Sequence, residues 1–304
     1  MTNFILIFLC IGVGLLLSKK KLVPADAHKP VNMWLIYIAL PALALRYIPE
    51  VEWNFHILIS IAGPVLIWLG AWLFVKLYDR KKKLSPGSHT ALLVTCGLGN
   101  TAFIGFPMVA AFYGEDQIHH AVVFDQITFI LFSTLGIITI LRTSAESAKE
   151  IKFVYIGRKV FSFPPLVACF LALILSRFLD FSFANSLLDK LVATMSPLAL
   201  FSIGLQMKLG AFRQEWRLIS AGLLYKLILA PCIVLLLAFL LGTKGDLAEI
   251  SVFEAGMSSH ITVSLLASQY NLNPRYCSLV VGSGILIGFV TSTCWFFIGG
   301  FIFG

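Results

Sequence analysis

The sequence predicts an all-α integral membrane protein with ten transmembrane helices, arranged as two inverted five-helix repeats. Three observations predict this fold: the apolar composition, a long series of apolar segments, and short sequence echoes between the two halves of the chain. Hydrophobic residues make up 59% of the 304 residues and charged residues only 12%, which is far outside the range of a soluble globular domain. Because the apolar segments recur along the whole chain, we expect a polytopic helix bundle.

Ten apolar segments of suitable length are bounded by charged residues or by Gly and Pro. They lie at about residues 2–18, 31–48, 57–78, 90–113, 121–141, 160–178, 187–207, 217–242, 249–271 and 276–303. Three lysines, Lys19 to Lys21, follow the first segment, where a secretory signal would have small residues for cleavage. We therefore interpret this segment as a span of the mature protein.

The distribution of basic residues predicts the orientation of these spans. Of the 23 Lys and Arg residues, 18 lie in the loops that follow the odd-numbered spans. The opposite loops, such as residues 49–56 and 115–120, carry almost none. Since cytoplasmic loops are rich in Lys and Arg, both termini are expected on the non-cytoplasmic side. The net charge of +8 thus reflects topology and contact with membrane lipid, and we expect no nucleic-acid partner.

The sequence lacks the motifs that several classes of function require. The six cysteines include no CxxC pair, so neither a disulfide framework nor a metal site is expected, and we predict no cofactor. There is no HExxH motif, and no histidine follows Ser283 in the segment VGSG, so we do not predict an enzyme and assign no catalytic residues. Nothing resembles a channel filter or a charged ring. These exclusions favour a transporter.

The two halves of the chain show a weak internal repeat. Pro41 in PALAL corresponds to Pro197 in PLALF, and Pro64 in the third span corresponds to Pro231 in the eighth. We therefore expect a first five-helix repeat over residues 1–142, a cytoplasmic linker over 143–159 and a second repeat over 160–304. An odd number of spans in each repeat inverts the second copy, as in many secondary transporters.

The fourth span is interrupted in its middle. Residues 99–107 read GNTAFIGFP, with two glycines, an asparagine and a proline where a membrane helix should be continuous. Inside a bilayer, a helix is broken only where protein or a water-lined cavity satisfies the freed peptide groups. Such breaks mark transport sites, and Asn100 is the first candidate to contact a ligand. The alternative is a hydrogen bond between helices with a structural role only.

The ninth span should contain the equivalent break if the repeat holds. Gly256, Ser258, Ser259, His260 and Thr262 are crowded into one short stretch there, without a proline. Two interpretations stay open at this point: a broken helix, or a kinked but continuous one in which Ser and Thr bond back to their own helix.

The chain resembles the auxin efflux carrier family, in its bacterial type. The resemblance covers essentially the whole sequence, and its strongest parts are residues 100–107, FYG at 112–114, LPALAL in the second span, SPLALFSIGLQM in the seventh, and Glu254-Ala255-x-Met257 with Ala267, Tyr270 and Pro274. The family commonly has proline at the position of Ser258, often asparagine at that of Thr262, and a small residue at that of His260, so this chain departs from the pattern there.

The resemblance implies a fold and a function. The fold is that of bile-acid and sodium/proton transporters, with helices 4 and 9 broken and crossing at the substrate site and the other helices divided between a scaffold and a transport unit. The implied location is the plasma membrane, which is the inner membrane of a bacterium. The implied cargo is a small organic anion, with malate, malonate and similar carboxylates associated with bacterial relatives, and a homodimer is one expected assembly.

The candidate site residues fall into three groups. Those expected at the substrate are Asn100, Thr101, Gly105, Pro107, Met257, Ser258, Ser259 and Thr262. Those considered for ion or proton coupling are Asp125, Glu254 and Lys226, and those considered for cavity lining are Gln126 and Gln206. Ionisable groups at membrane depth usually face a cavity or a partner. For the two acidic residues, the competing interpretation is solvation at the interface or a structural ion pair with Lys226.

These observations predict a secondary transporter of small organic anions, either malate- or malonate-like carboxylates or auxin-like weak acids, that works by alternating access at the crossover. The alternative is a sodium-coupled transporter of a different solute, such as a bile-acid-like amphiphile, on the same fold, because architecture does not decide the substrate.

Overall fold

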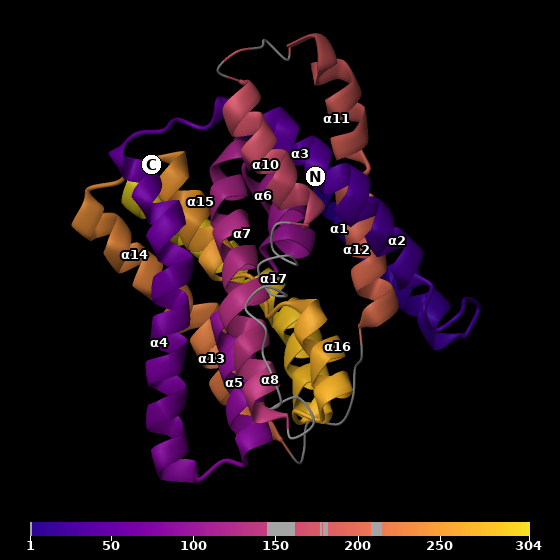
Figure 1. Cartoon of the computed structure of the whole chain (residues 1–304), viewed down its shortest axis with the longest axis vertical. Helices are drawn as coiled ribbons and strands as arrows, with labels where there is room; N and C mark the ends of the chain where they lie inside the picture. Colours follow the sequence, from indigo (N-terminus) through magenta and orange to yellow (C-terminus); the bar gives the residue numbers. More distant parts are fainter. Residues whose placement is uncertain (1, 145–161, 177, 179–181, 208–214) are drawn as a thin grey trace. The chain divides into compact units, whose positions relative to one another are not determined.

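The computed structural model describes residues 2–144, 162–176, 178, 182–207 and 215–304. Most of the predicted linker, residues 143–159, lies outside this part of the chain. The described residues form helices, short turns and one isolated antiparallel bridge (Figure 1). Among the described residues, six helices are long and apolar enough to cross a membrane, at His28–Glu50, Phe55–Lys82, Glu115–Thr143, Asn185–Gln206, Trp216–Leu241 and Pro274–Phe303. The structure thus shows a multi-pass membrane protein, and the number of ten spans stays a prediction.

The helices have the following bounds. They are α1 (Thr2–Lys19), α2 (His28–Trp34), α3 (Leu40–Tyr47), α4 (Leu58–Lys82), α5 (Pro86–Gly97), α6 (Phe106–Phe112), α7 (His119–Leu131), α8 (Ile137–Thr143), α10 (Pro164–Leu175), α11 (Asn185–Ala193), α12 (Met195–Gln206), α13 (Trp216–Leu224), α14 (Ala230–Leu241), α15 (Asp246–Ala255), α16 (Ile261–Tyr270) and α17 (Pro274–Phe303). π-Helical turns join α2 to α3 (Leu35–Ala39), precede α6 (Thr101–Gly105), join α7 to α8 (Phe132–Gly136) and join α13 to α14 (Tyr225–Leu229).

The chain divides into two compact units, and each unit takes segments from both halves of the sequence. The first unit contains residues 1–52, 102–123 and 157–207, and the second contains 53–101, 124–156 and 208–304. This division by packing does not follow the order of the chain, so it is a different division from the predicted repeats. The repeat boundaries stay a prediction.

In the first unit, α1 packs closely against α12. A Cβ atom on Gly14 would lie 2.4 Å from the carbonyl oxygen of Phe201, and one on Gly204 would lie 2.3 Å from that of Ile11. Only glycine permits this approach of two backbones, which is how membrane helices gain van der Waals contact. Elsewhere in this unit Arg46 on α3 donates to Asp189 on α11 over 2.7 Å and also pairs with Glu50.

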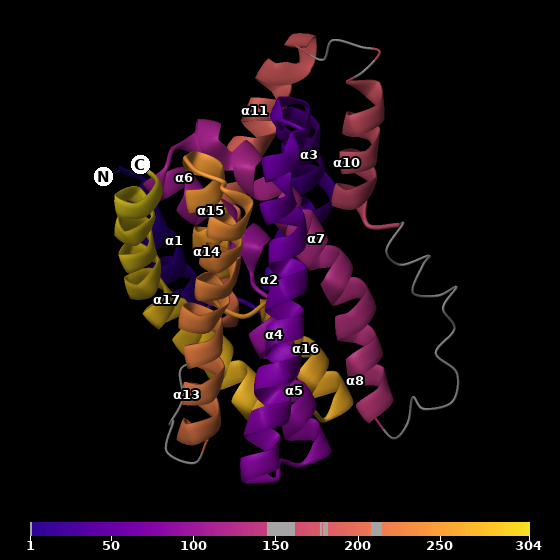
Figure 2. The same cartoon turned by 90° about the vertical axis from the view of Figure 1, so that its left-hand side faces the viewer.

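In the second unit, α4 packs against α5, α14 and α15, while α17 packs against α5, α13, α15 and α16. Figures 1 and 2 show α13 and α14 following one another as one long rod. Two polar contacts between these helices are buried: Ser60 on α4 faces Ser251 on α15 with 3.3 Å between their Oγ atoms, and the Thr95 hydroxyl on α5 lies 2.9 Å from that of Tyr276 on α17.

Of the four π-helical turns in the part of the chain that the structure describes, three are followed closely by a proline. Pro41, Pro107 and Pro231 each stand two residues after the end of such a turn. A proline lacks an N–H group, and its ring collides with the carbonyl four residues earlier in a regular helix. A wider π turn moves that carbonyl aside. For Pro231 the freed carbonyl is that of Leu227, and it accepts a hydrogen bond of 2.9 Å from the indole Nε1 of Trp295.

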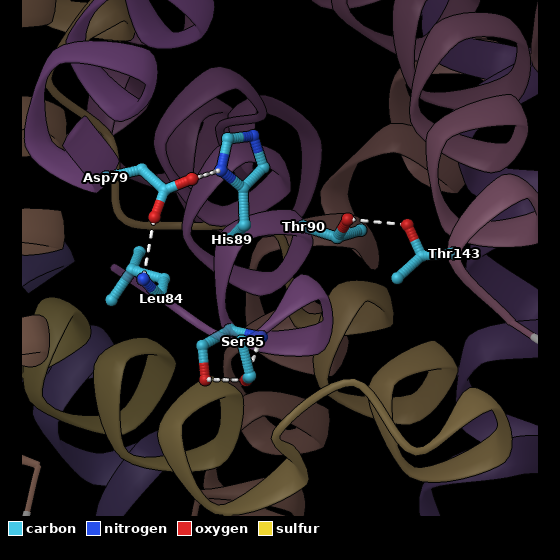
Figure 3. Close-up of polar contacts among 7 residues, drawn as sticks. Asp79, Leu84, Ser85, His89, Thr90 and Thr143 are labelled. Atoms are coloured by element: carbon cyan, nitrogen blue, oxygen red, sulfur yellow. Dashed lines mark hydrogen bonds and ion pairs between the residues drawn. The ribbon is translucent and has the colours of Figure 1, made fainter. Parts of the chain in front are cut away.

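The turn between α4 and α5 is held by a polar clamp, drawn in Figure 3. The Asp79 carboxylate accepts from the backbone N–H of Leu84 over 2.6 Å and contacts Nδ1 of His89 over 2.9 Å. Ser85 caps the N-terminus of α5 by accepting from the N–H of Ser88. The hydroxyls of Thr90 and Thr143 lie 2.7 Å apart and join α5 to α8. These bonds set the position of α5, whose other end leads into the candidate site.

Candidate functional site

Two interrupted segments of the second unit cross and bond to each other through their backbones. α5 ends at Gly97, α15 ends at Ala255, and helical structure resumes at Thr101 and at Ile261. Between these ends, the N–H of Asn100 donates to the carbonyl of Ser258 over 2.8 Å, and the N–H of His260 donates to that of Leu98 over 3.1 Å. Gly99 and Ser259 therefore face each other as an antiparallel pair. We call residues 98–100 and 258–260 the crossover.

The crossover explains how both breaks are tolerated at membrane depth. Peptide groups freed by a helix break must find a partner inside the protein, and here each broken segment satisfies the other. The ninth span is therefore broken, and the interpretation of a kinked but continuous helix is wrong (Figure 1). A proline at position 258 is not needed for the break, because the bonds that replace the helix come from the other segment.

The helices that begin at the crossover point their N-terminal ends towards it. One runs over Thr101–Phe112 and passes from the second unit into the first after Thr101, and the other is α16. An N-terminal helix end carries unpaired N–H groups and a partial positive charge, which favour an anion. Asn100 and Thr101 are 2% exposed, as are Ser258 and Ser259. These four residues, all predicted from the sequence, thus lie in one buried cluster.

The side chains around the crossover tie it to neighbouring helices. The Ser259 hydroxyl donates to the carbonyl of Thr95 over 2.7 Å. The Ser258 hydroxyl has no hydrogen-bond partner in the described residues. His260 stacks on Phe132 with 4.9 Å between ring centroids, and its Nδ1 accepts from the N–H of Thr262 over 3.2 Å. Met257 is buried beside them.

Asp125 and Gln126, at the middle of α7, bond to the start of the resumed helix. The Thr101 hydroxyl donates to one carboxylate oxygen of Asp125 over 2.5 Å, and Nε2 of Gln126 donates to the other over 3.1 Å. Asp125 is 6% exposed, so solvation at the membrane surface is not its environment. The structure therefore places one of the candidate coupling residues in direct contact with Thr101, the residue that follows the first crossover segment.

Glu254 and Lys226 lie at the C-terminal end of α15. Glu254 is the penultimate residue of α15 and is fully buried, and neither of its carboxylate oxygens has a hydrogen-bond partner among the residues that the structure describes. Lys226 lies in the π-helical turn Tyr225–Leu229, is 2% exposed, and donates from Nζ to the carbonyl of Ala255 over 2.6 Å. Glu254 lies within electrostatic range of both Lys226 and Asp125.

Three predicted residues lie in the first unit. Gly105 and Pro107 belong to the helix that follows the crossover and are buried, but their role there is in the backbone, since the π-helical turn Thr101–Gly105 leads directly to the proline. Gln206 on α12 donates to the hydroxyl of Ser202 over 3.0 Å, and Ser202 in turn donates to Asn32 over 2.5 Å. Gln206 thus forms part of a separate polar network within that unit.

Thr95 and Trp295 are examples of residues at the site that were not predicted from the sequence. Thr95 provides the carbonyl that accepts from Ser259, and Trp295 holds the carbonyl freed by Pro231. A usable signal existed for Trp295, because its indole N–H stands deep within the last apolar segment rather than near a span end, where an interfacial belt would place it. Thr95 had no such signal, since its contribution comes from the backbone.

Comparisons with known proteins show which family the chain is similar to. A family described as "Membrane transport protein" matches residues 1–296. An uncharacterized transporter of Methanothermobacter thermautotrophicus is 24% identical over 290 residues, covering 93% of each chain. A second uncharacterized transporter, of Methanocaldococcus jannaschii, is 28% identical over 280 residues, covering 87% of this chain and 85% of its own. Auxin efflux carrier component 8 of Arabidopsis thaliana is 25% identical over 123 residues, which is 37% of this chain and 32% of the plant protein.

Proposed function

The chain belongs to the membrane transport protein family, the auxin efflux carrier family that its motifs predict, and we propose that it is a secondary transporter of small organic anions. The proposed cargo is a malate- or malonate-like carboxylate or an auxin-like weak acid, carried by alternating access. The observation that carries the proposal is the crossover, where two helix breaks are joined by the bonds from Asn100 to Ser258 and from His260 to Leu98.

Two features of the crossover support an anionic cargo. The N-terminal ends of the helices that resume at Thr101 and Ile261 carry partial positive charge, and small hydroxyl residues stand beside them. The hydroxyl of Ser258, which has no hydrogen-bond partner among the described residues, is a donor that a carboxylate could accept. In transporters with discontinuous helices, such N-terminal ends point at anionic groups of the substrate.

Two carboxyl groups are the proposed coupling sites. An isolated charge at membrane depth is costly, so a carboxyl group there either exchanges a proton or pairs with a cation. Asp125 is bonded to Thr101, the residue directly after the first crossover segment, while Glu254 has neither oxygen bonded among the described residues. Of the two, we propose Asp125 as the group that senses the substrate, because the Thr101 hydroxyl connects it directly to the site.

Transport by the Asn100→Ala variant tests this proposal. Proteoliposomes with the full-length protein are assayed for uptake of a panel of labelled mono- and dicarboxylates at two pH values. We expect Asn100→Ala to abolish uptake while the variant stays inserted and folded, and Gln269→Ala, at an exposed position on α16, to behave as the wild type. Undiminished uptake by Asn100→Ala would overturn the site assignment.

The same vesicles separate the alternative function. If uptake of every carboxylate is absent but a sodium gradient drives uptake of a bile-acid-like amphiphile, the chain is a sodium-coupled transporter of a different solute. Thermal-shift measurements add a second readout, because a ligand that binds only the folded state raises its apparent melting temperature. We expect the carboxylate that is transported to raise the melting temperature of the wild type and not of Asn100→Ala.

A further inference from the structure

A buried lysine stands at the point where two helices end, and the proposed binding of an anion does not use it. Lys226 is 2% exposed, and its ammonium group donates to the carbonyl of Ala255, the last residue of α15. A Cβ atom on Gly99 would lie only 3.1 Å from Lys226 Nζ and 3.2 Å from Cε. The ammonium group therefore lies against the segment that directly follows α5.

The two helix ends beside Lys226 are both C-terminal ends. The last carbonyl groups of a helix have no partner within that helix, and together they carry about half a negative charge. α5 and α15 both end at the crossover, so two partial negative charges meet inside the protein. A cation between them is favourable for the same reason that Lys and Arg are favourable in the last turn of a helix.

Transporters with discontinuous helices commonly place a mobile cation at such a position, where helix C-termini and unwound carbonyls coordinate it. Resting on the proposed function, which makes the crossover the transport site, we propose that Lys226 is a resident cation that takes the place of a coupling sodium ion. Its ammonium group neutralises the C-terminal ends of α5 and α15, so that the crossover forms and the transporter works without bound sodium.

Glu254 completes this arrangement. Its carboxylate is fully buried one residue before Ala255, it lies within electrostatic range of Lys226, and neither oxygen is hydrogen-bonded among the described residues. The negative charge of a buried carboxylate needs a nearby cation. If the ammonium group is removed, the Glu254 carboxylate and the Ala255 carbonyl become oxygen ligands of the kind that alkali cations prefer. The loss of Lys226 should therefore create a binding site for a monovalent cation.

The backbone is built to bring the lysine to this place. Pro231 forces the π-helical turn Tyr225–Leu229, which contains Lys226. Trp295 satisfies the carbonyl of Leu227 that the turn frees. Gly99 leaves the space that the ammonium group occupies. The position of the lysine is thus supported from the turn that carries it, from α17 and from the crossover.

The first test uses the purified wild-type protein and needs no substrate. Its apparent melting temperature is measured in sodium chloride and in choline chloride at equal ionic strength. A resident lysine cation leaves no position for sodium, so we expect the two melting temperatures to agree and no saturable binding of labelled sodium. A melting temperature that rises with sodium in a saturable way would overturn the proposal.

The second test removes the charge. Lys226→Met keeps most of the side-chain volume, and Lys226→Ala leaves a gap. We expect both variants to lose roughly 10 °C in melting temperature, because removal of one partner strands a buried charge, whereas Lys226→Arg should lose less. Lys244→Ala, at an exposed loop position, is the matched control. A melting temperature of Lys226→Met equal to that of the wild type would overturn the proposal, since packing alone would then account for the residue.

The third test restores the charge from solution. We expect sodium chloride, and n-butylammonium at millimolar concentration, to raise the melting temperature of Lys226→Ala, while 1-butanol, which has the same shape without the charge, does not. The double variant Lys226→Ala, Glu254→Gln should lose this response. Equal rescue by butanol would contradict the proposal. If the neutral variants do not fold and Lys226→Arg does, the need for a positive charge at this position is supported. If no variant folds, the sodium titration of the wild type decides whether the proposal stands.

These readouts distinguish this proposal from the proposed function. Absent uptake of every carboxylate, together with a sodium-independent wild type and cation rescue of Lys226→Ala, would contradict the cargo and support the resident cation. Carboxylate uptake that requires sodium would support the cargo and overturn the resident cation.

Discussion

The two arms of the crossover reach the same geometry by different local means. The first arm breaks with Gly99 and Asn100 and resumes through a π-helical turn that ends two residues before Pro107. The second arm breaks with Gly256 and three polar residues, contains no proline, and resumes in a regular helix at Ile261. The first arm leaves the helix over residues 98–100 and the second over residues 256–260, and each donates one backbone hydrogen bond to the other.

This difference shows where the information for the second break lies. A proline breaks a helix locally, by removing a donor and by steric collision. In the second arm the break is instead stabilised by the first arm, which offers the Asn100 N–H and the Leu98 carbonyl. The break in the first arm thus follows from residues within that arm. The break in the second arm depends largely on its hydrogen bonds to the first arm. Four variants test this comparison, from the largest expected effect to the smallest.

His260→Pro should have the largest effect. It removes the N–H that donates to the buried carbonyl of Leu98 over 3.1 Å, which is half of the bonding between the arms. A buried acceptor left without a donor costs about 1–3 kcal/mol, and we expect a loss near the upper limit together with loss of uptake. The control is His260→Ala, which keeps the N–H and loses only the ring that stacks on Phe132. Wild-type melting of His260→Pro would show that the arms do not depend on each other.

Gly99→Val should be the next most damaging. A Cβ atom at this position already lies 3.1 Å from Lys226 Nζ, and two further methyl groups must displace the lysine or the facing residue Ser259. Overpacking of this kind costs about 1–3 kcal/mol. Gly300→Val on α17 is the control, because nothing lies within 4 Å of a Cβ atom there. Equal melting temperatures for the two variants, measured in the same detergent, would contradict close packing at the crossover.

Thr101→Val tests the bond from the first arm to α7. The substitution keeps the shape of the side chain but removes the hydroxyl that donates to Asp125 over 2.5 Å. We expect a loss of about 1.5 kcal/mol, because hydrogen bonds to carboxylates are stronger than average, and a lower uptake rate. Thr139→Val, whose hydroxyl bonds only to its own helix at Leu135, should be nearly neutral. If Thr101→Val and Asp125→Asn act through this bond, their effects in the double variant will be less than additive.

Ser258→Pro should have the smallest effect. The crossover uses the carbonyl of Ser258, which a proline retains. Gly284 on α17 packs against the Ser258 side chain, because a Cβ atom on that glycine would lie 3.3 Å from the serine Cβ. We expect a change within about 1 kcal/mol in either direction, since a compatible proline mainly restricts the unfolded chain. A large loss of stability would mean that the second arm depends on features of Ser258 itself.

Much of the site could be predicted from the sequence because its elements have local causes. Two glycines, Asn100 and Pro107 within an apolar segment predicted the first break. The structure confirms this break, between Gly97 and Thr101. The break in the ninth span was left between two interpretations, since its bonding partners lie some 160 residues earlier in the chain and a local pattern does not contain them.

The environments of the charged residues could not be predicted from the sequence, for a related reason. Asp125 could equally have been solvated at the surface, and only packing shows that it accepts from Thr101 and Gln126. The same holds for Glu254, which is fully buried without a hydrogen-bond partner among the described residues. Distances between side chains on different helices depend on how the helices are rotated and packed, and hydropathy alone does not specify that rotation.

The amino-acid sequence alone determined that this is a helical membrane protein, that its fourth span is interrupted, and to which family it belongs, because hydropathy, proline and glycine act locally on the backbone. Only the tertiary structure decided that the ninth span is broken and that Lys226 lies between two helix ends. The physical reason is that peptide groups removed from a helix inside a membrane must be satisfied by whatever segment is near in space, and distant parts of the chain provide that segment.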